Sequence, residues 1–146
     1  MIITEMSRVE CMALLSAQRV GRLGCSRNGQ PYVVPITFAL EGNHLYSFSL
    51  TGQKIDWMRA NPLVCVQADE FGQHGEWRSV VVNGTFEELP DRIGWKHARD
   101  HAWSLLSTHA NWWEPGGLKP APEGPTPHLF YRVIIETMTG RRAVAE

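Results

Sequence analysis

Three hydroxyl side chains alternate along one segment and lead to a glycine and a lysine: Ser47, Ser49, Thr51, Gly52 and Lys54. In an extended strand, alternate residues point to the same side, so the three hydroxyls share one face. Phe48 and Leu50 then point to the other, inward side. Alternating polar residues on a strand often meet only water, and a solvated outer face is the alternative interpretation.

The residues after Thr51 favour an anion site over a merely solvated face. Lys54 begins a stretch of helical composition that reaches Ala60 and ends before Asn61-Pro62. The N–H groups at a helix start, the positive end of the helix dipole and the lysine charge all attract an anion. Convergent donors of this kind suit a phosphate monoester. The Gly-x-x-x-x-Gly-Lys pattern of a nucleotide P-loop is absent.

A proline interrupts a second strand-like segment, residues 32–40. Pro35 has no N–H to donate to a strand ladder, so it marks an edge, a bulge or a place where the backbone faces something other than a strand. A ligand is one such thing.

Other patterns give weaker indications of chemistry. His97 and His101 have the spacing that lets two imidazoles share a metal, but no third ligand is evident, and we predict no metal site. A Gly-x-Ser-x-Gly elbow, a carboxylate pair and a Cys-His pair are all missing. If the protein is an enzyme, a cofactor therefore carries the difficult chemistry.

The elements that must position these residues are mostly strands. Ser7 and Glu10 form a capping-box pattern before a helix over residues 8–17, and Asn28-Gly29 is a strong hairpin signal. Further helices are predicted over 54–60 and 91–106, and strands over 20–25, 32–40, 44–49, 63–69, 77–87 and 129–136. Consecutive hairpins without regular strand–helix alternation predict a mainly β fold with flanking helices, a six-stranded antiparallel barrel.

Composition limits the remaining possibilities. A chain of 146 residues suits a single domain, residues 1–146, and it contains no apolar run of the roughly 20 residues that a membrane span needs. The first residues lack the features of a secretory signal, so we expect a cytoplasmic protein with reduced thiols at its three cysteines. A net charge of -1 with scattered basic residues argues against nucleic acid as a partner.

Several segments, in this order and spacing, resemble the pyridoxamine 5′-phosphate oxidase-like flavoproteins, and among these the branch of the nitroimidazole-resistance (Nim) proteins. They are Val34-Pro35-Ile36-Thr37-Phe38, Leu45-Tyr46-Ser47-Phe48-Ser49, Gly52-Gln53-Lys54-Ile55, residues 59–66, residues 77–84 and Thr139-Gly140-Arg141. The resemblance implies an FMN-binding split barrel and a homodimer with FMN at the subunit interface, each flavin held by both chains.

The resemblance also implies roles for individual residues. Pro35, Ile36 and Thr37 would follow the isoalloxazine ring. Ser47, Ser49 and Lys54 would hold the phosphate, with Thr51 and Gly52 shaping the turn, and Trp77, Arg78 and Ser79 would approach the polar edge of the ring. Arg141 and Arg142 lack the histidine context of the true oxidases, so vitamin B6 oxidation is not expected.

The function that follows is an FMN-dependent oxidoreductase, with NADH or NADPH as electron donor and a small planar acceptor such as a nitroaromatic compound or a quinone. Two alternatives stay open: a flavin-binding module that transfers electrons without a substrate of its own, and the same barrel with FAD, a deazaflavin or haem. Trp112 and Trp113, beside a Pro/Gly-rich loop, could build the subunit interface, cover a flat ring or pack in the core.

Overall fold

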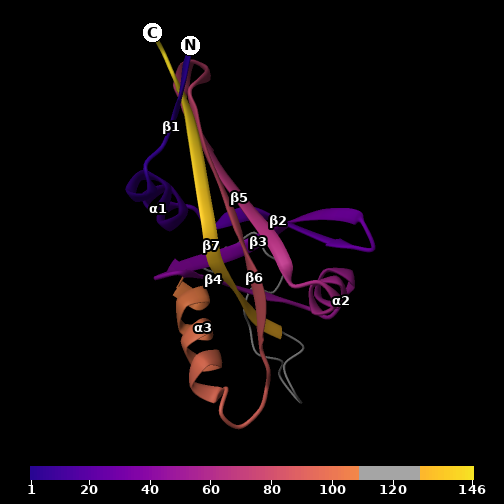
Figure 1. The fold of residues 1–146 in the computed structure, drawn as a ribbon. Coiled ribbons are helices and arrows are strands. Elements are labelled where there is room, and N and C mark those ends of the chain that lie inside the picture. The colour runs from indigo at the N-terminus through magenta and orange to yellow at the C-terminus, as the bar shows by residue number, and fades with distance from the viewer. Residues whose placement is uncertain (109–128) are drawn as a thin grey trace.

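The computed structural model describes residues 1–108 and 129–146, so Trp112, Trp113 and the predicted loop at 114–127 lie outside the described residues. The strands are β1 (Ile2–Glu5), β2 (Val20–Arg27), β3 (Gln30–Glu41), β4 (His44–Ser49), β5 (Leu63–Phe71), β6 (Trp77–Leu89) and β7 (Leu129–Val144). The helices are α1 (Arg8–Ala17), α2 (Gln53–Ala60) and α3 (Lys96–Thr108), with a short 3-10 turn at Gln73–Gly75 (Figure 1).

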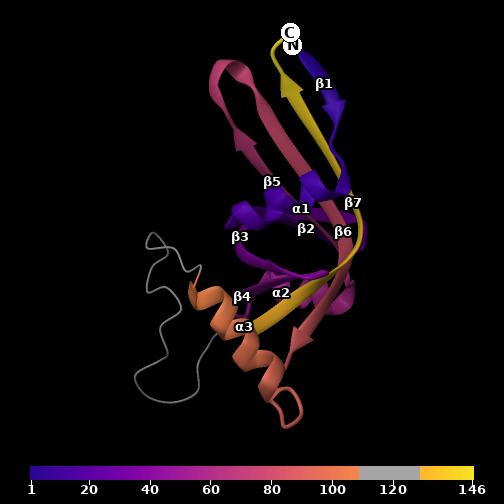
Figure 2. The ribbon, with the colours of Figure 1, turned by 90° about the vertical axis from the view of Figure 1, so that its left-hand side faces the viewer.

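The sheet closes on itself. Its strand order is β1-β7-β4-β3-β2-β5-β6, every pairing is antiparallel, and an additional pairing between β6 and β7 joins six strands into a ring. The predicted six-stranded antiparallel barrel is therefore confirmed. β1 was not predicted, and it adds to the outside of the ring along the end of β7, which brings the two chain termini together (Figures 1 and 2).

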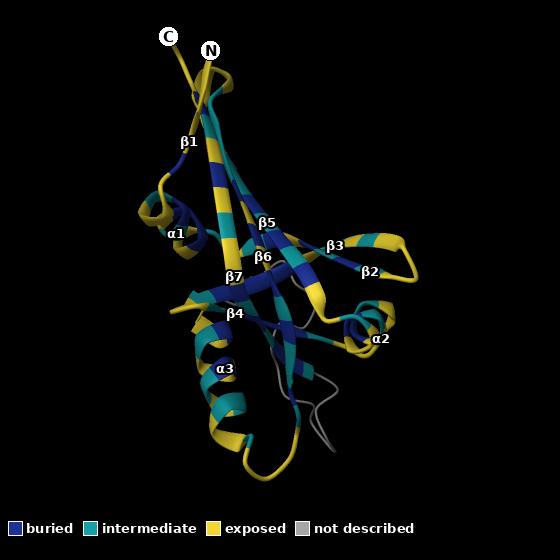
Figure 3. Ribbon diagram, in the orientation of Figure 1, coloured by how far each residue is buried: buried dark blue, intermediate teal, exposed yellow. Residues whose placement is uncertain are grey.

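Apolar side chains pack in two clusters, one inside the ring and one beneath α3. Figure 3 marks the buried residues along the strands and helices. The inner cluster takes side chains from α1, α2 and the strands, among them Leu15, Phe38 and Met58. The outer cluster joins Phe48 of β4 to Leu106 of α3. Both faces of β4 are consequently buried. No helix in the described ranges is long and apolar enough to cross a bilayer.

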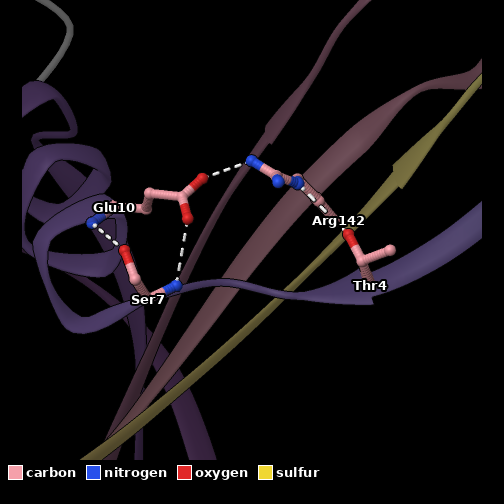
Figure 4. A network of polar contacts seen from close by, with 4 residues as sticks. All are labelled: Thr4, Ser7, Glu10 and Arg142. Carbon is pink, nitrogen blue, oxygen red and sulfur yellow. Dashed lines mark hydrogen bonds and ion pairs between the residues drawn. The ribbon is translucent and has the colours of Figure 1, made fainter.

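The predicted helix over residues 8–17 is confirmed, together with its capping box. Glu10 N–H donates to Ser7 Oγ at 3.2 Å, and Ser7 N–H donates to Glu10 Oε1 at 3.1 Å. Arg142 of β7 pairs with the same carboxylate and reaches Thr4, so α1 is tied to the β1–β7 ladder (Figure 4). Backbone hydrogen bonding and then the Ser7 hydroxyl lower the pKa of Glu10.

The third helix begins later than predicted. The sequence predicted a helix over residues 91–106, but α3 begins at Lys96 and Ile93 is fully exposed. Gly94 has φ +97°, in the left-handed region, so no right-handed helix can run through it. Turns therefore occupy the expected first turn of the helix.

Candidate functional site

β3 and β4 part where the candidate site lies. Their ladder runs from Glu41 opposite His44 to Phe38 opposite Ser47 and ends there. We call this end of the ladder, at Phe38 and Ser47, the fork. Beyond the fork, β3 continues along β2 as far as Gln30, whereas β4 continues along β7. Residues 30–37 of β3 therefore have a strand neighbour on one side only within the described chain. Pro35 lies in this stretch, where a residue without an N–H is tolerated.

Ser47 stands at the fork, and its hydroxyl donates to the carbonyl oxygen of Thr37 at 2.6 Å. Ser47 is only 1% exposed, and the buried Tyr131 lies opposite it on β7. The predicted facing of the strand was wrong: Phe48 packs beneath α3, and Leu50 is 56% exposed instead of turned inward. Because both faces of β4 are covered, its polar–apolar alternation does not separate a wet face from a dry one.

Thr37 is the second buried polar residue of the fork. Its neighbours Ile36 and Phe38 point into the inner cluster and Ala39 into the outer one, so the Thr37 side chain lies on the outer side of the sheet. Its hydroxyl is buried and has no hydrogen-bond partner among the residues that the structure describes. Buried hydroxyls are nearly always paired, so this one fits a polar group supplied by a ligand.

The start of α2 lies where the sequence predicts an anion site. Gly52 is the N-cap residue in extended conformation, no side chain in residues 1–108 or 129–146 caps the helix, and a Cβ added at Gly52 would meet open space. The first helical hydrogen bond runs from Asp56 N–H to Gly52 O at 3.0 Å, which places the N–H groups of residues 53–55 ahead of the helical ladder. Lys54 is half-buried in this first turn, and Thr51 is exposed beside it.

Ser49 links the end of β4 to this turn. It is half-buried, and its hydroxyl donates to the adjacent Leu50 carbonyl at 2.7 Å. A bond to a neighbour in sequence at a partly exposed position leaves this hydroxyl able to rotate toward a ligand. Lys54 also lies near the buried Cys25 thiol, whose pKa is raised chiefly by burial.

Trp77, Arg78 and Ser79 lie elsewhere, in the part of β5, β6 and β7 that extends away from the α2 end of the barrel (Figure 2). Arg78 pairs with Glu70 at 2.7 Å, and Ser79 Oγ accepts from Gln67 Nε2 at 3.0 Å. A groove of about 340 Å³ opens beside them, lined by Trp77, Ser79, Val81, Thr139, Gly140 and Arg141.

Within one chain, this groove lies away from the fork. Pro35 pairs with Arg22, Arg22 with Gln67, and Gln67 with Val81, which forms one row across four strands. At about 4.8 Å per strand, Pro35 and Val81 lie roughly 14 Å apart along the sheet. Both belong to one face of the sheet.

That face carries exposed apolar side chains and a cleft. Val33 and Leu63 are each 65% exposed, and Val81 is 36% exposed. A cleft of about 490 Å³ lies between the β2–β3 hairpin and β5, lined mainly by Gly24, Cys25, Pro31, Tyr32, Val33, Leu63 and Cys65. Exposed apolar side chains beside a cleft are typical of an interaction face.

The two histidines of α3 do not form a metal site in the described residues, where no group of three ligands could hold an ion. His101 Nε2 instead lies 2.7 Å from Glu41 Oε1 and thereby ties α3 to the end of β3.

Comparison with known proteins gives consistent results over nearly the whole chain. A family model described as pyridoxamine 5′-phosphate oxidase matches residues 7–142. An uncharacterised protein of Rhizobium meliloti (strain 1021) is 53% identical, covering 99% of this chain and 98% of its own.

Solved structures agree in fold. The structure of a FAD-binding protein from Mesorhizobium loti is 55% identical, with a TM-score of 0.85, and covers 99% of this chain and 100% of its own. A candidate 5-nitroimidazole antibiotic resistance protein from Bacteroides thetaiotaomicron VPI-5482 has a TM-score of 0.76 and 20% identity, covering 97% of this chain and 87% of its own, a similarity that shows the fold alone.

Proposed function

The chain belongs to the pyridoxamine 5′-phosphate oxidase family, and from this premise we propose that it is a flavin-dependent oxidoreductase that holds FMN, or the FMN part of FAD, at the fork between β3 and β4. The observation that carries the proposal is the junction of the open β3 edge with the start of α2. The relative from Mesorhizobium loti, named as a FAD-binding protein, supports a flavin as the ligand.

The residues present fit the two ends of a flavin mononucleotide. The uncapped start of α2, Lys54 and the hydroxyls of Ser49 and Thr51 would hold the phosphate, with Gly52 allowing close approach. Pro35 and Thr37 lie on the outer side of β3, where the ring would bind. There the unpartnered hydroxyl of Thr37 would gain a hydrogen bond from the ring, while Ile36 supports the strand from the inner cluster.

A homodimer completes this site. Trp77, Arg78 and Ser79 lie on a strand that is three strand spacings from Pro35 of their own chain. Both groups border the exposed apolar face that carries Val33 and Leu63. We therefore assign Trp77–Ser79 of the partner subunit to the polar edge of the ring, with this face as the dimer interface.

The bound flavin would supply the redox chemistry, and the protein would supply position and electrostatics. The proposed electron donor is NADH or NADPH, and the proposed acceptor is a nitroaromatic compound or a quinone, a planar class that suits the groove beside Trp77. The polar side chains around Ser79 would stabilise the negative charge of a reduced ring.

The cofactor is tested by the visible spectrum of freshly purified protein and by mass identification of whatever denaturation releases. Release of FMN or FAD supports the proposal and decides between them, and a colourless protein that binds neither overturns it. Anaerobic mixing with NADH or NADPH tests the reductase activity. A flavin that stays oxidised with both donors indicates the non-catalytic electron-transfer module instead.

A further inference from the structure

We propose that Ser47 is a positioning residue for the flavin ring and not a ligand of its phosphate; this inference rests on the proposed function. The hydroxyl of Ser47 connects the strand that carries the ring end of the site to the strand that leads to the phosphate end. Ser47 thereby sets where Thr37 stands relative to the start of α2.

The geometry assigns the hydroxyl hydrogen of Ser47 to the protein itself. The Ser47 hydroxyl donates this hydrogen to Thr37 O, and the two oxygen atoms are 2.6 Å apart. This short bond joins two residues that are 1% and 5% exposed. A serine has one hydrogen to donate, so donation to a phosphate oxygen would require breaking this buried bond. Ser49 and Thr51, by contrast, lie nearer the surface.

The location of the bond makes it a link between the two half-sites. Past Phe38 and Ser47, β3 is held by β2 and β4 by β7, and in the described residues the two strands share no further ladder pair. The Ser47–Thr37 bond lies at the last point of contact. Without it, Thr37 can shift with β2 while Lys54 stays with β4 and α2.

Tyr131 offers a matched control. It is paired with Ser47 across the β4–β7 ladder and is fully buried, and its hydroxyl faces the Ser47 hydroxyl without a well-formed hydrogen bond in the described residues. Tyr131→Phe therefore removes a hydroxyl beside Ser47 and leaves the bond from Ser47 to Thr37 O in place.

Riboflavin, which has the ring but no phosphate, separates the two roles of a flavin-binding residue. FMN and riboflavin are titrated by fluorescence quenching against the wild-type protein and the variants Ser47→Ala, Lys54→Ala and Tyr131→Phe. We expect Ser47→Ala to weaken both ligands by the same factor, about 5- to 30-fold for a lost buried hydrogen bond, and to shift the visible absorption bands of bound FMN. Lys54→Ala should weaken FMN alone, and Tyr131→Phe neither ligand.

Loss of stability must be kept apart from loss of positioning. Val80→Ala, a core truncation in β6, shows how much affinity falls from destabilisation alone at a temperature where every variant is folded. If Ser47→Ala does not fold, Ser47→Cys keeps the volume of the side chain with a much weaker donor, and the same equal loss is expected.

Each outcome decides the question. A loss of FMN affinity with unchanged riboflavin affinity would make Ser47 a phosphate ligand after all, and unchanged affinity for both would remove it from the site. If Val80→Ala loses as much affinity for both ligands as Ser47→Ala, the effect of Ser47→Ala is a loss of stability and not of positioning. A wild-type protein that binds neither flavin overturns the proposed function and the positioning role with it.

Discussion

Lys54→Ala should weaken FMN binding much more than it changes folding. Lys54 lies in the first turn of α2, where the positive end of the helix dipole repels a cation. Removing that repulsion, worth about 0.3–1 kcal/mol, and introducing alanine, the best helix former, should offset the loss of the other contacts of the lysine, so we expect only a small change in the stability of the flavin-free protein. Asp56 in the same turn keeps the favourable acidic charge.

FMN binding should weaken at the same time. A charge-assisted hydrogen bond to a phosphate contributes about 1.5–3 kcal/mol, which corresponds to a roughly 10- to 150-fold increase in Kd. Urea unfolding of the flavin-free protein and fluorescence titration with FMN measure the two quantities, with Lys96→Ala at the start of α3 as a control lysine. A clear loss of stability with unchanged FMN affinity would show that Lys54 is a structural residue and would refute the anion-site reasoning.

Three further changes test the structure itself. Tyr131→Phe should change the free energy of unfolding by less than about 1 kcal/mol, because the Tyr131 hydroxyl faces Ser47 without a well-formed hydrogen bond in the described residues; a larger loss in urea unfolding would mean that this hydroxyl is fully bonded. Gly84→Ala should cost about 3 kcal/mol in the same assay, because a Cβ there would lie 2.3 Å from Ile134 O; a neutral result would contradict the close approach of β6 and β7. Burial and then Arg132 lower the pKa of His44, so stability should fall as the pH falls below about 6.5, where the unfolded chain gains the proton first. His44→Gln should flatten this part of the pH–stability curve relative to wild type, and identical curves would refute the assignment.

Elements with local signals were predictable. The capping box of Ser7 and Glu10 satisfies the first N–H groups of α1 whatever the rest of the chain does, and the predicted bounds match the helix. Asn28 and Gly29 both have positive φ, 51° and 79°, as the Asn-Gly hairpin signal requires. The bounds of α2 also have local signals, since Gly52 is its N-cap residue and Asn61-Pro62 ends it.

Elements that depend on distant partners were not predictable. β1 has four exposed residues and exists because Ile2 meets Val144 and Glu5 meets Arg141 at the far end of the chain. No local pattern encodes such a pairing. The facing of β4 failed for a similar reason, because α3, nearly 50 residues later in the sequence, covers the side that alternation would leave in water.

The same distinction applies to the site. Gly52 and Lys54 are two positions apart in the sequence, so their common place at the start of α2 could be predicted from the sequence alone. Trp77–Ser79 and Pro35 share the family's sequence pattern, yet three strand spacings separate their positions on the sheet. A motif selects residues that act on one ligand, but only the strand register shows whether one chain can bring them together. Here the register separates Trp77–Ser79 from Pro35 by three strand spacings, and the proposed dimer, in which a second copy of the chain supplies Trp77–Ser79, would bring both groups to one flavin.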